Sequence, residues 1–384
     1  QRQMCIRDRI STNSAYIVSD AKYPVTFEYA GQDTETVRIT ANEGEAITND
    51  IIYGSVSGKK SDEDGKALGS AVIGIFKTGT TEFTKENAIA ATTSKDDGSF
   101  SFVKVPYGTW IIREIESPKG YVLSEEEIAV TIGKVDEVVE IELVNYFIKG
   151  NIALTKVDED YPDNKLSGAV FEVYSDTKGN GKLDKDDTLL GEMKELDGGV
   201  YQMSELRYGK YLVKETKAPT GFVLDENVYA VSIEENGKTY TVENKAGVGF
   251  INAAQKGSLK IVKTSSDGKV EGFSFRVTGV DYDQTFKTDK NGEIVIEGLR
   301  IGDYTVSEVS DKASAGYILP ADKQVTVKVN ATAIVQMHNE FRDTPKTGDD
   351  FNLGLWVSLA ALSVVGAGVL GFVGYKNRKK KKED

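Results

Sequence analysis

The sequence predicts an all-β protein made of tandem sandwich domains. Apolar and polar residues alternate with a period of two over short stretches, and Gly, Asp and Asn turns separate these stretches. Helical periodicity is nearly absent before the C-terminal region, and the whole pattern recurs along the chain. Units of about 85–105 residues suit antiparallel, seven-stranded, immunoglobulin-like sandwiches.

The repeats are recognised by the spacing Asn-x4-Gly-x5-Lys at their joints. This spacing occurs at 49–60, 145–156 and 252–263. We therefore expect three complete repeats at 51–150, 151–257 and 258–341. Residues 10–50 are interpreted as the C-terminal part of a truncated earlier repeat. Residues 1–9 (QRQMCIRDR) resemble a translated sequencing adapter, and we interpret them as an artefact.

Each repeat has the same elements in the same order. A first strand ends in a lysine, at 56–60, 152–156 and 259–263. A second strand follows at 68–72, 166–171 and 270–275, and an Asp-Gly or Asn-Gly turn leads into a third. A second glycine turn comes next, at Gly108, Gly209 and Gly302. Six residues after that glycine there is always a glutamate.

Composition excludes several kinds of protein. The formal net charge of −13 argues against a nucleic-acid partner. One Cys and one His cannot form a disulfide framework or a zinc site, and Cys5 belongs to the segment set aside above. We expect no cofactor. Covalent stabilisation of the repeats would have to use other chemistry.

Three polar residues recur at equivalent positions of every repeat. The sets are Lys60/Glu114/Asn145, Lys156/Glu215/Asn252 and Lys263/Glu308/Asn339. Polar residues on strands usually face water. Here, residues two and four positions earlier on the same strand face are apolar, except Gly58, so all nine side chains should point into the core.

A buried lysine and a buried glutamate are costly unless paired or neutralised. Burial lowers the pKa of lysine and raises that of glutamate. A neutral amine is a nucleophile that could attack an asparagine carboxamide and expel ammonia, with a protonated glutamate as proton shuttle. The product would be an internal Lys–Asn isopeptide bond, formed once and without turnover.

The repeats resemble the collagen-adhesin B-type (CnaB, SpaA-like) domains of Gram-positive surface proteins. Tyr211 to Phe222 (YLVKETKAPTGF) is similar to the E-box of that family, and Trp110 to Tyr121 matches it too. The third copy departs, since Val309 to Tyr317 is two residues longer and has no proline. The resemblance implies a CnaB-type fold, cross-linking lysines and asparagines, and catalytic Glu114, Glu215 and Glu308. A loop of roughly 97 residues between Lys156 and Asn252 would restrict the unfolded chain by about 4–5 kcal/mol.

The C-terminal region predicts a cell-wall anchor. The sequence is uncharged at 353–375, long enough for a single transmembrane helix, and the basic tail at 376–384 places that end in the cytoplasm. The linker at 342–352 contains Thr344, Pro345, Lys346, Thr347 and Gly348, which resemble the LPXTG sorting signal. The resemblance implies sortase cleavage after Thr347 and transfer to a peptidoglycan precursor, although Thr344 replaces the usual leucine. An ordinary single-pass anchor is the alternative.

Two weaker signals remain. Asp176, Asn180, Asp184 and Asp187 have the spacing of a calcium-binding loop, but Lys178 occupies a ligand position and a solvated acidic turn is the simpler interpretation. Alternation points His338, the single histidine, away from the core. We expect no metal site.

The leading functional hypothesis is a wall-anchored surface stalk, extracellular on a Gram-positive bacterium, that carries an adhesive module with an unknown host or surface ligand. One alternative is a sortase-polymerised pilin subunit. Another is the stalk of a surface enzyme whose N-terminal catalytic module is missing. Beyond the single-turnover cross-link, we find no catalytic constellation and do not expect an enzyme.

Overall fold

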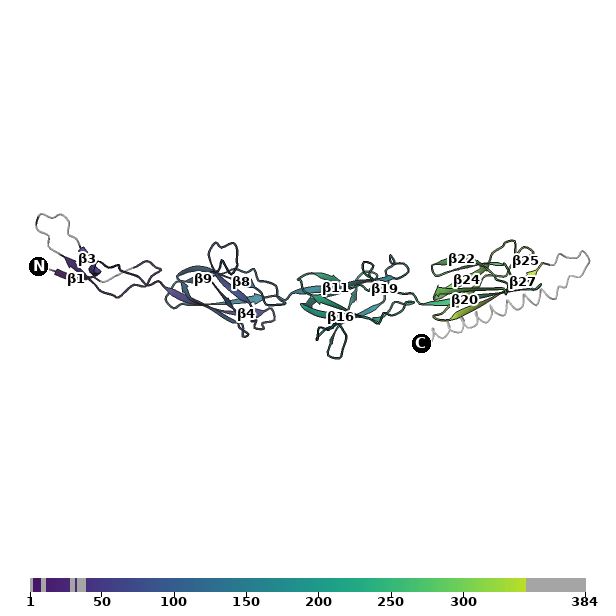
Figure 1. The fold of residues 1–384 in the computed structure, drawn as a ribbon, viewed down its shortest axis with the longest axis horizontal. Coiled ribbons are helices and arrows are strands. Elements are labelled where there is room, and N and C mark those ends of the chain that lie inside the picture. Colours follow the sequence, from purple (N-terminus) through teal and green to yellow (C-terminus); the bar gives the residue numbers. More distant parts are fainter. Residues whose placement is uncertain (1–2, 8–11, 28–31, 33–38, 343–384) are drawn as a thin grey trace, which may run out of the picture. The chain divides into compact units, whose positions relative to one another are not determined.

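The computed structural model describes residues 3–7, 12–27, 32 and 39–342 of the 384-residue chain. It divides into two units, Gln1–Ala254 and Gln255–Asp384, which we describe one at a time. The described residues form strands and turns, with one 3-10 turn at Asn42–Gly44 (Figure 1). The all-β prediction is therefore confirmed.

The first unit begins with a small antiparallel sheet. It consists of β1 (Gln3–Arg7), β2 (Tyr23–Phe27) and β3 (Ile39–Ala41), in the order β1-β2-β3. β1 lies in the segment that the sequence analysis set aside, so this segment pairs with residues downstream. Its origin as an adapter stays a prediction.

Repeat 1 is a sandwich of two sheets. One sheet has the order β10-β4-β7, with β4 (Tyr53–Asp62), β7 (Ser99–Pro106) and β10 (Val138–Asn145). The other has the order β6-β5-β8-β9, with β5 (Val72–Lys77), β6 (Ala90–Thr93), β8 (Gly108–Glu116) and β9 (Ile128–Ile132). The core between them includes Val56, Ile73, Ile112 and Leu143, all fully buried.

Repeat 2 repeats this plan with a divided last strand. Its first sheet has the order β14-β15-β11-β18, with β11 (Lys149–Asp158), β14 (Lys194–Glu195), β15 (Val200–Arg207), β18 (Thr239–Thr241) and, also on β11, β19 (Phe250–Asn252). The second has the order β13-β12-β16-β17, with β12 (Val170–Ser175), β13 (Thr188–Glu192), β16 (Gly209–Lys217) and β17 (Val228–Ile233).

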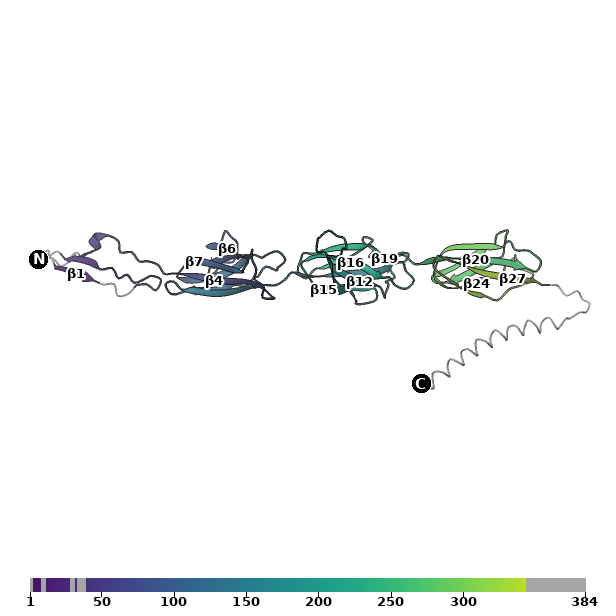
Figure 2. The same cartoon turned by 90° about the horizontal axis from the view of Figure 1, so that it is seen from below.

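The second unit contains repeat 3, again with two sheets (Figure 2). The first has the order β23-β20-β27-β25, with β20 (Lys256–Ser265), β23 (Glu293–Arg300), β25 (Tyr317–Ile318) and β27 (Thr332–Phe341). The second has the order β22-β21-β24-β26, with β21 (Ser274–Gly279), β22 (Tyr282–Lys287), β24 (Gly302–Glu308) and β26 (Lys323–Val327).

One feature differs from the antiparallel sandwich expected from the sequence. The last strand of each repeat pairs in parallel with the first: β10 with β4, β18 and β19 with β11, and β27 with β20. The strand before the last lies in the opposite sheet, so the chain crosses the sandwich and returns beside the first strand in the same direction. This pairing places the lysine of the first strand opposite the residue two positions before the asparagine of the last strand.

The glycine of the joint spacing has a steric cause. A Cβ on Gly54 would lie 2.6 Å from the carbonyl oxygen of Glu137, and one on Gly257 would lie 2.2 Å from that of Lys328. In both repeats the turn before the last strand crosses directly over the first strand. Only glycine allows that close backbone approach.

The expected anchor lies outside this description. Residues 343–384, which hold the sorting motif, the proposed membrane helix and the basic tail, are not among the described residues. Within the described part of the chain, no helix has the length and apolar character needed to cross a membrane.

Candidate functional site

Each repeat brings its lysine, glutamate and asparagine together inside the sandwich. The lysine and asparagine come from neighbouring parallel strands of one sheet, and the glutamate comes from the facing sheet, on β8, β16 or β24. In the strand pairing, each lysine lies opposite the residue two positions before its asparagine. The cluster therefore joins the two ends of the repeat across its core.

All nine side chains are buried, as the alternation predicted. The lysines are at most 1% exposed and the asparagines at most 3%, while Glu114 and Glu215 are at most 1% exposed. Glu308 is the most accessible, at 9%. Charged side chains are rarely buried this deeply without a specific partner.

The glutamate binds the asparagine carboxamide in every repeat. Asn145 Nδ2 donates to both carboxyl oxygens of Glu114, at 3.1 and 2.9 Å, and Asn252 Nδ2 donates to both of Glu215, at 3.0 Å each. Asn339 Nδ2 donates to Glu308 Oε1 alone, at 2.7 Å. The three asparagine Oδ1 atoms have no hydrogen-bond partner among the described residues.

The lysine amines lie close to these groups. Lys60 Nζ donates to the Leu143 carbonyl at 3.2 Å, and Lys156 Nζ donates to the Phe250 carbonyl at 3.1 Å. Lys156 Nζ is also 3.8 Å from Glu215 Oε1. Each accepting carbonyl belongs to the residue two positions before the asparagine, so these two amines point toward the asparagine-bearing strand.

Burial shifts both kinds of ionisable group toward their neutral forms. Desolvation lowers the pKa of Lys60, Lys156 and Lys263, and that of Lys156 falls to about 8. Desolvation raises the pKa of the three glutamates, against the opposing effect of their hydrogen bonds and of the lysine charge. A neutral amine and a protonated carboxyl are the forms that amide exchange requires.

The profile of the SpaA family, described as a prealbumin-like fold domain, matches residues 54–146, 150–246 and 257–341. These three matches cover most of the chain. The chain belongs to the SpaA family. A search of curated protein sequences gave no significant match.

The SpaA repeats share their fold with a solved structure, and other solved structures match with lower scores. The Bacillus anthracis TIE protein aligns with a TM-score of 0.59 at 24% identity, over 83% of this chain and 59% of that one. The chain thus spans less than two thirds of the length of that protein. Among other matches are the Bacillus cereus major pilin subunit BcpA (TM-score 0.34, 16% identity, 75% of this chain and 99% of that chain) and a streptococcal ancillary pilin (TM-score 0.29, 16% identity, 75% and 99%).

The third SpaA repeat differs from the other two at its glutamate. In repeats 1 and 2, a backbone N–H ten residues after the glutamate donates to its Oε2 at 2.8 Å, from Ser124 and Asp225. Glu308 Oε2 has no partner among the described residues. Lys263 Nζ donates to the carbonyl of its own neighbour, Thr264. The longer E-box loop, noted in the sequence, thus coincides with a less complete cluster.

Sequence reasoning missed these backbone donors and a pair beside them in repeat 2. Asp225 Oδ2 accepts a hydrogen bond from Asn244 Nδ2 at 2.9 Å, and Asn244 in turn binds the backbone of Ile251, next to Asn252. The backbone donors, Ser124 and Asp225, both lie ten residues after the glutamate of their repeat, and this shared spacing is present in the sequence. Asn244 had no such signal, because it lies in an insertion that the other repeats lack.

In the candidate calcium loop, the carboxylates of Asp176 and Asp187 accept hydrogen bonds from the backbone of the loop itself. Asp176 accepts from the backbone N–H groups of Asn180 and Gly181, and Asp187 accepts from those of Thr177 and Asp184. The Lys178 ammonium lies 2.9 Å from Asp184 Oδ2. Across the described residues, no group of three or more His, Cys, Asp or Glu side chains could hold a metal ion.

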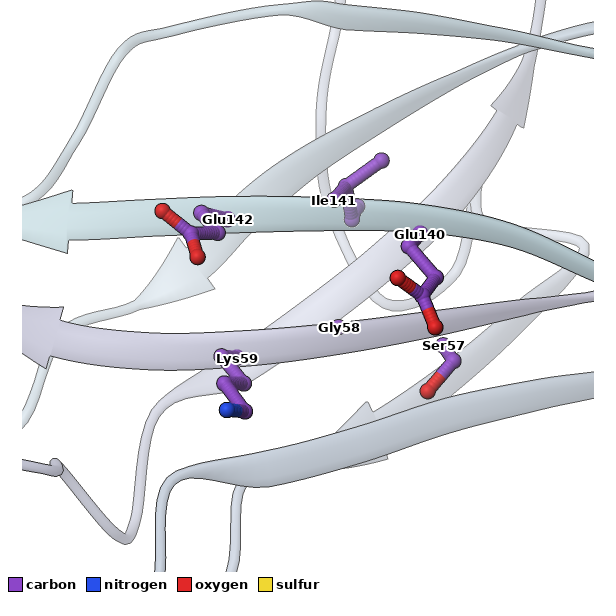
Figure 3. Close-up of a pocket in the computed structure, with 6 residues that line it drawn as sticks. All are labelled: Ser57, Gly58, Lys59, Glu140, Ile141 and Glu142. Carbon is purple, nitrogen blue, oxygen red and sulfur yellow. The ribbon is translucent and has the colours of Figure 1, made fainter.

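The neighbours of the cluster residues face solvent. Figure 3 shows Lys59 on β4 across from Glu142 on β10, and Ser57 across from Glu140, at a hollow lined by these two strands. Lys59 is exposed while Lys60 is buried, so Lys60 is the lysine that reaches the core. His338 is half exposed, as alternation predicted, and bonds to Thr264 Oγ1 and Glu340.

Proposed function

We propose that this chain is a stalk segment of a Gram-positive surface protein whose SpaA repeats become cross-linked by Lys–Asn isopeptide bonds. One observation carries the proposal: each repeat buries a lysine, a glutamate and an asparagine in one cluster where its first and last strands pair. A buried ion pair adds little net stability by itself. A reaction between the two strands would explain why each repeat buries these three polar side chains together.

The proposed reaction balances without a cofactor. The neutral amine of Lys156 attacks Cγ of Asn252, and the Cγ–Nδ2 bond breaks. Glu215, which already holds Nδ2, transfers the proton from the attacking amine to the departing nitrogen. The products are one amide bond and one ammonia. The glutamate ends as it began, so it is a catalyst for one turnover.

Mass spectrometry of the intact chain tests this proposal. Each bond should lower the mass by about 17 Da, the mass of one ammonia. Glu215→Ala should prevent the loss in repeat 2 and leave repeats 1 and 3 unchanged. Glu226→Ala removes an exposed acid from the same repeat and should change nothing. A chain with its full sequence mass would refute the cross-link.

We also propose that the sorting motif at 344–348 is a sortase substrate that joins Thr347 to a peptidoglycan precursor, with the apolar segment at 353–375 as a temporary membrane anchor. The expected location is the cell wall. Incubation with sortase and an amine nucleophile should cleave the chain after Thr347. Thr347→Ala should block cleavage, and Thr344→Leu should accelerate it with a housekeeping sortase. Cleavage elsewhere, or none with any sortase class, would contradict this part.

The pilin alternative shares the same repeats and differs in polymerisation. Purified cell walls should release this chain in one size class if it is a monomeric stalk, and as a ladder of high-mass species if sortase polymerises it. A surface enzyme would need a catalytic module outside the repeats.

A further inference from the structure

Repeat 2 contains a half-buried aspartate that contacts both sides of its cluster. Asp225 lies between β16 and β17, ten residues after Glu215, and its backbone N–H donates to Glu215 Oε2 at 2.8 Å. Its side-chain Oδ2 accepts from Tyr229 Oη at 2.6 Å and from Asn244 Nδ2 at 2.9 Å. Its Oδ1 accepts from the Asn227 backbone at 3.0 Å. The carboxylate is therefore fixed by three neighbours.

Asn244 extends this contact to the strand that carries Asn252. Its Nδ2 donates to the Ile251 carbonyl at 2.9 Å, and its Oδ1 accepts from the Ile251 N–H at 2.6 Å. A side-chain amide that binds both backbone groups of one residue replaces the pairing that a neighbouring strand would give. β11 pairs with one edge of β19, and Asn244 binds the backbone of its central residue, Ile251.

The need for this support is specific to repeat 2. β19 has three residues, Phe250–Asn252, and the loop after β18 separates it from the rest of the last strand. In repeats 1 and 3 the asparagine lies on continuous strands, Val138–Asn145 and Thr332–Phe341. A three-residue strand fixes its terminal side chain poorly without further contacts.

Repeat 1 provides a natural comparison. Ser124 occupies the place of Asp225, and its backbone N–H makes the same 2.8 Å bond to the glutamate. Its hydroxyl, however, accepts from the nearby backbone of Glu126. The backbone contact is thus common to both repeats, and the side-chain link to the asparagine strand belongs to repeat 2.

We propose that Asp225 and Asn244 are positioning residues that hold Asn252 against Glu215 and Lys156 for the cross-linking reaction of repeat 2. This inference rests on the proposed cross-link. The pair touches no reacting atom through its side chains. It acts through the backbone of Ile251 and through the loop that presents the Asp225 N–H to Glu215.

The test follows each bond in the full chain over time. The chain is made by cell-free translation, aliquots are quenched in acid, and tryptic peptides report the Lys156–Asn252 and Lys60–Asn145 bonds separately. Asp225→Ala and Asn244→Ala should slow the repeat 2 bond by about ten- to a hundred-fold, the range expected for a misplaced reacting group. The repeat 1 bond in the same molecule should keep its rate.

Rescue separates positioning from general damage to the fold. Asp225→Asn keeps an oxygen that can accept from Tyr229 and Asn244, so it should restore most of the rate. Ser124→Ala is the matched control in repeat 1 and should have no effect, because it keeps the backbone N–H. If Asp225→Ala fails to fold, Asn244→Ala and Asp225→Asn decide the question.

The outcomes are distinct. Wild-type rates in Asn244→Ala, or an Asp225→Asn variant as slow as Asp225→Ala, would overturn the positioning role while leaving the cross-link in place. A wild-type chain that forms no bond in repeat 2 would instead refute the proposed function. If Asp225→Ala and Asn244→Ala slow bond formation in repeat 2 alone, and Asp225→Asn restores most of the rate, both the positioning role and the proposed cross-link are supported.

Discussion

At the scale of single residues, the proposed reaction in repeat 2 depends on the protonation states of Lys156 and Glu215. Attack requires Lys156 without its proton, and departure of ammonia requires Glu215 with one. Burial lowers the pKa of Lys156 to about 8 and raises that of Glu215 above its usual 4.5. Between these two pKa values, the pair holds one proton, and moving it from lysine to glutamate gives the reactive form without exchange with solvent.

We therefore expect the rate at which the Lys156–Asn252 bond forms to be independent of pH between these two pKa values, and to be lower at pH values outside that range. Above pH of about 8 the pair loses its last proton and the glutamate can no longer supply it. Below the pKa of Glu215 both groups are protonated and the amine is not nucleophilic. Mass spectrometry after a pH jump measures this rate. A rate that keeps rising up to pH 10 would mean that only the free amine matters.

The proposed cross-link should form more slowly in repeat 3 than in repeats 1 and 2. Its Glu308 makes one hydrogen bond to Asn339 and has a free Oε2 in the described structure, and Lys263 Nζ bonds to Thr264. The lysine must therefore rotate before it can attack. Time-resolved peptide mapping of the three bonds in one sample gives the order directly. Closure of repeat 3 first, or all three together, would show that these contacts do not limit the rate.

Most of the cluster could be predicted from alternation alone. Lys156, Glu215 and Asn252 share strand faces with apolar residues, so their burial follows from a period of two. The orientation of Lys263 Nζ toward Thr264 could not be predicted, because it depends on a rotamer and not on a strand face. Asn244 could not be predicted either, since an inserted loop has no equivalent in the other repeats.

At the scale of strands, Gly58 is the exception to the apolar pattern, and the structure explains it. A Cβ on Gly58 would lie 2.1 Å from the ring of Phe100, on the paired strand β7. The Phe100 ring thus fills the space that a side chain would occupy.

Gly58→Ala should consequently destabilise repeat 1 by about 1–3 kcal/mol, the usual cost of overpacking. Gly133→Ala is the matched control, because its nearest contact would be 3.8 Å away, at the end of the Glu137 side chain. Hydrogen exchange of peptides from β4 and β7 measures the effect within repeat 1. Equal protection in both variants would contradict the packing argument.

The order and type of the strands were predictable, and their pairing was not fully so. Turn residues and alternation located the first strand, the glycine turns and the glutamate strand of each repeat. The parallel pairing of β10 with β4 was not expected, because a period of two is the same for both directions. The division of the last strand of repeat 2 into β18 and β19 was also missed, since Phe250–Asn252 alone is too short to give a pattern.

At the largest scale that the structure fixes, the joint between repeats 1 and 2 is bonded on both sides. Three residues, 146–148, separate β10 from β11. Within them, Ile148 accepts from the Tyr208 N–H at 2.8 Å and donates to the Gly120 carbonyl at 2.9 Å. The joint is therefore part of the folded structure and not an extended linker. A force that reaches Lys156 would first have to separate β11 from both β15 and β18.

Arg207 joins the two repeats at this point. Its guanidinium lies 3.8 Å from the ring centroid of Phe147 and 2.9 Å from Asp64 Oδ2 in repeat 1. Lys149 and Glu63 form a second pair across the same joint, at 3.1 Å. These contacts are partly exposed, so each is modest on its own.

Removing Arg207 should loosen the joint without unfolding either repeat. In Arg207→Ala we expect amide exchange at Ile148 and Tyr208 to rise about five-fold, which corresponds to about 1 kcal/mol of lost cation–π and ion-pair energy.

Arg113→Ala is the control. It removes an arginine that stacks on Phe83 and pairs with Glu127 inside repeat 1, so it should leave exchange of the joint amides unchanged. Because the Arg207 side chain is exposed and contacts Phe147 and Asp64, which lie outside both buried clusters, the proposed cross-links should still form in either variant. If joint exchange is the same in Arg207→Ala as in the wild type, the backbone bonds of Ile148 hold the joint alone. If it rises equally in Arg113→Ala, the effect comes from charge and not from the contact with Phe147 and Asp64.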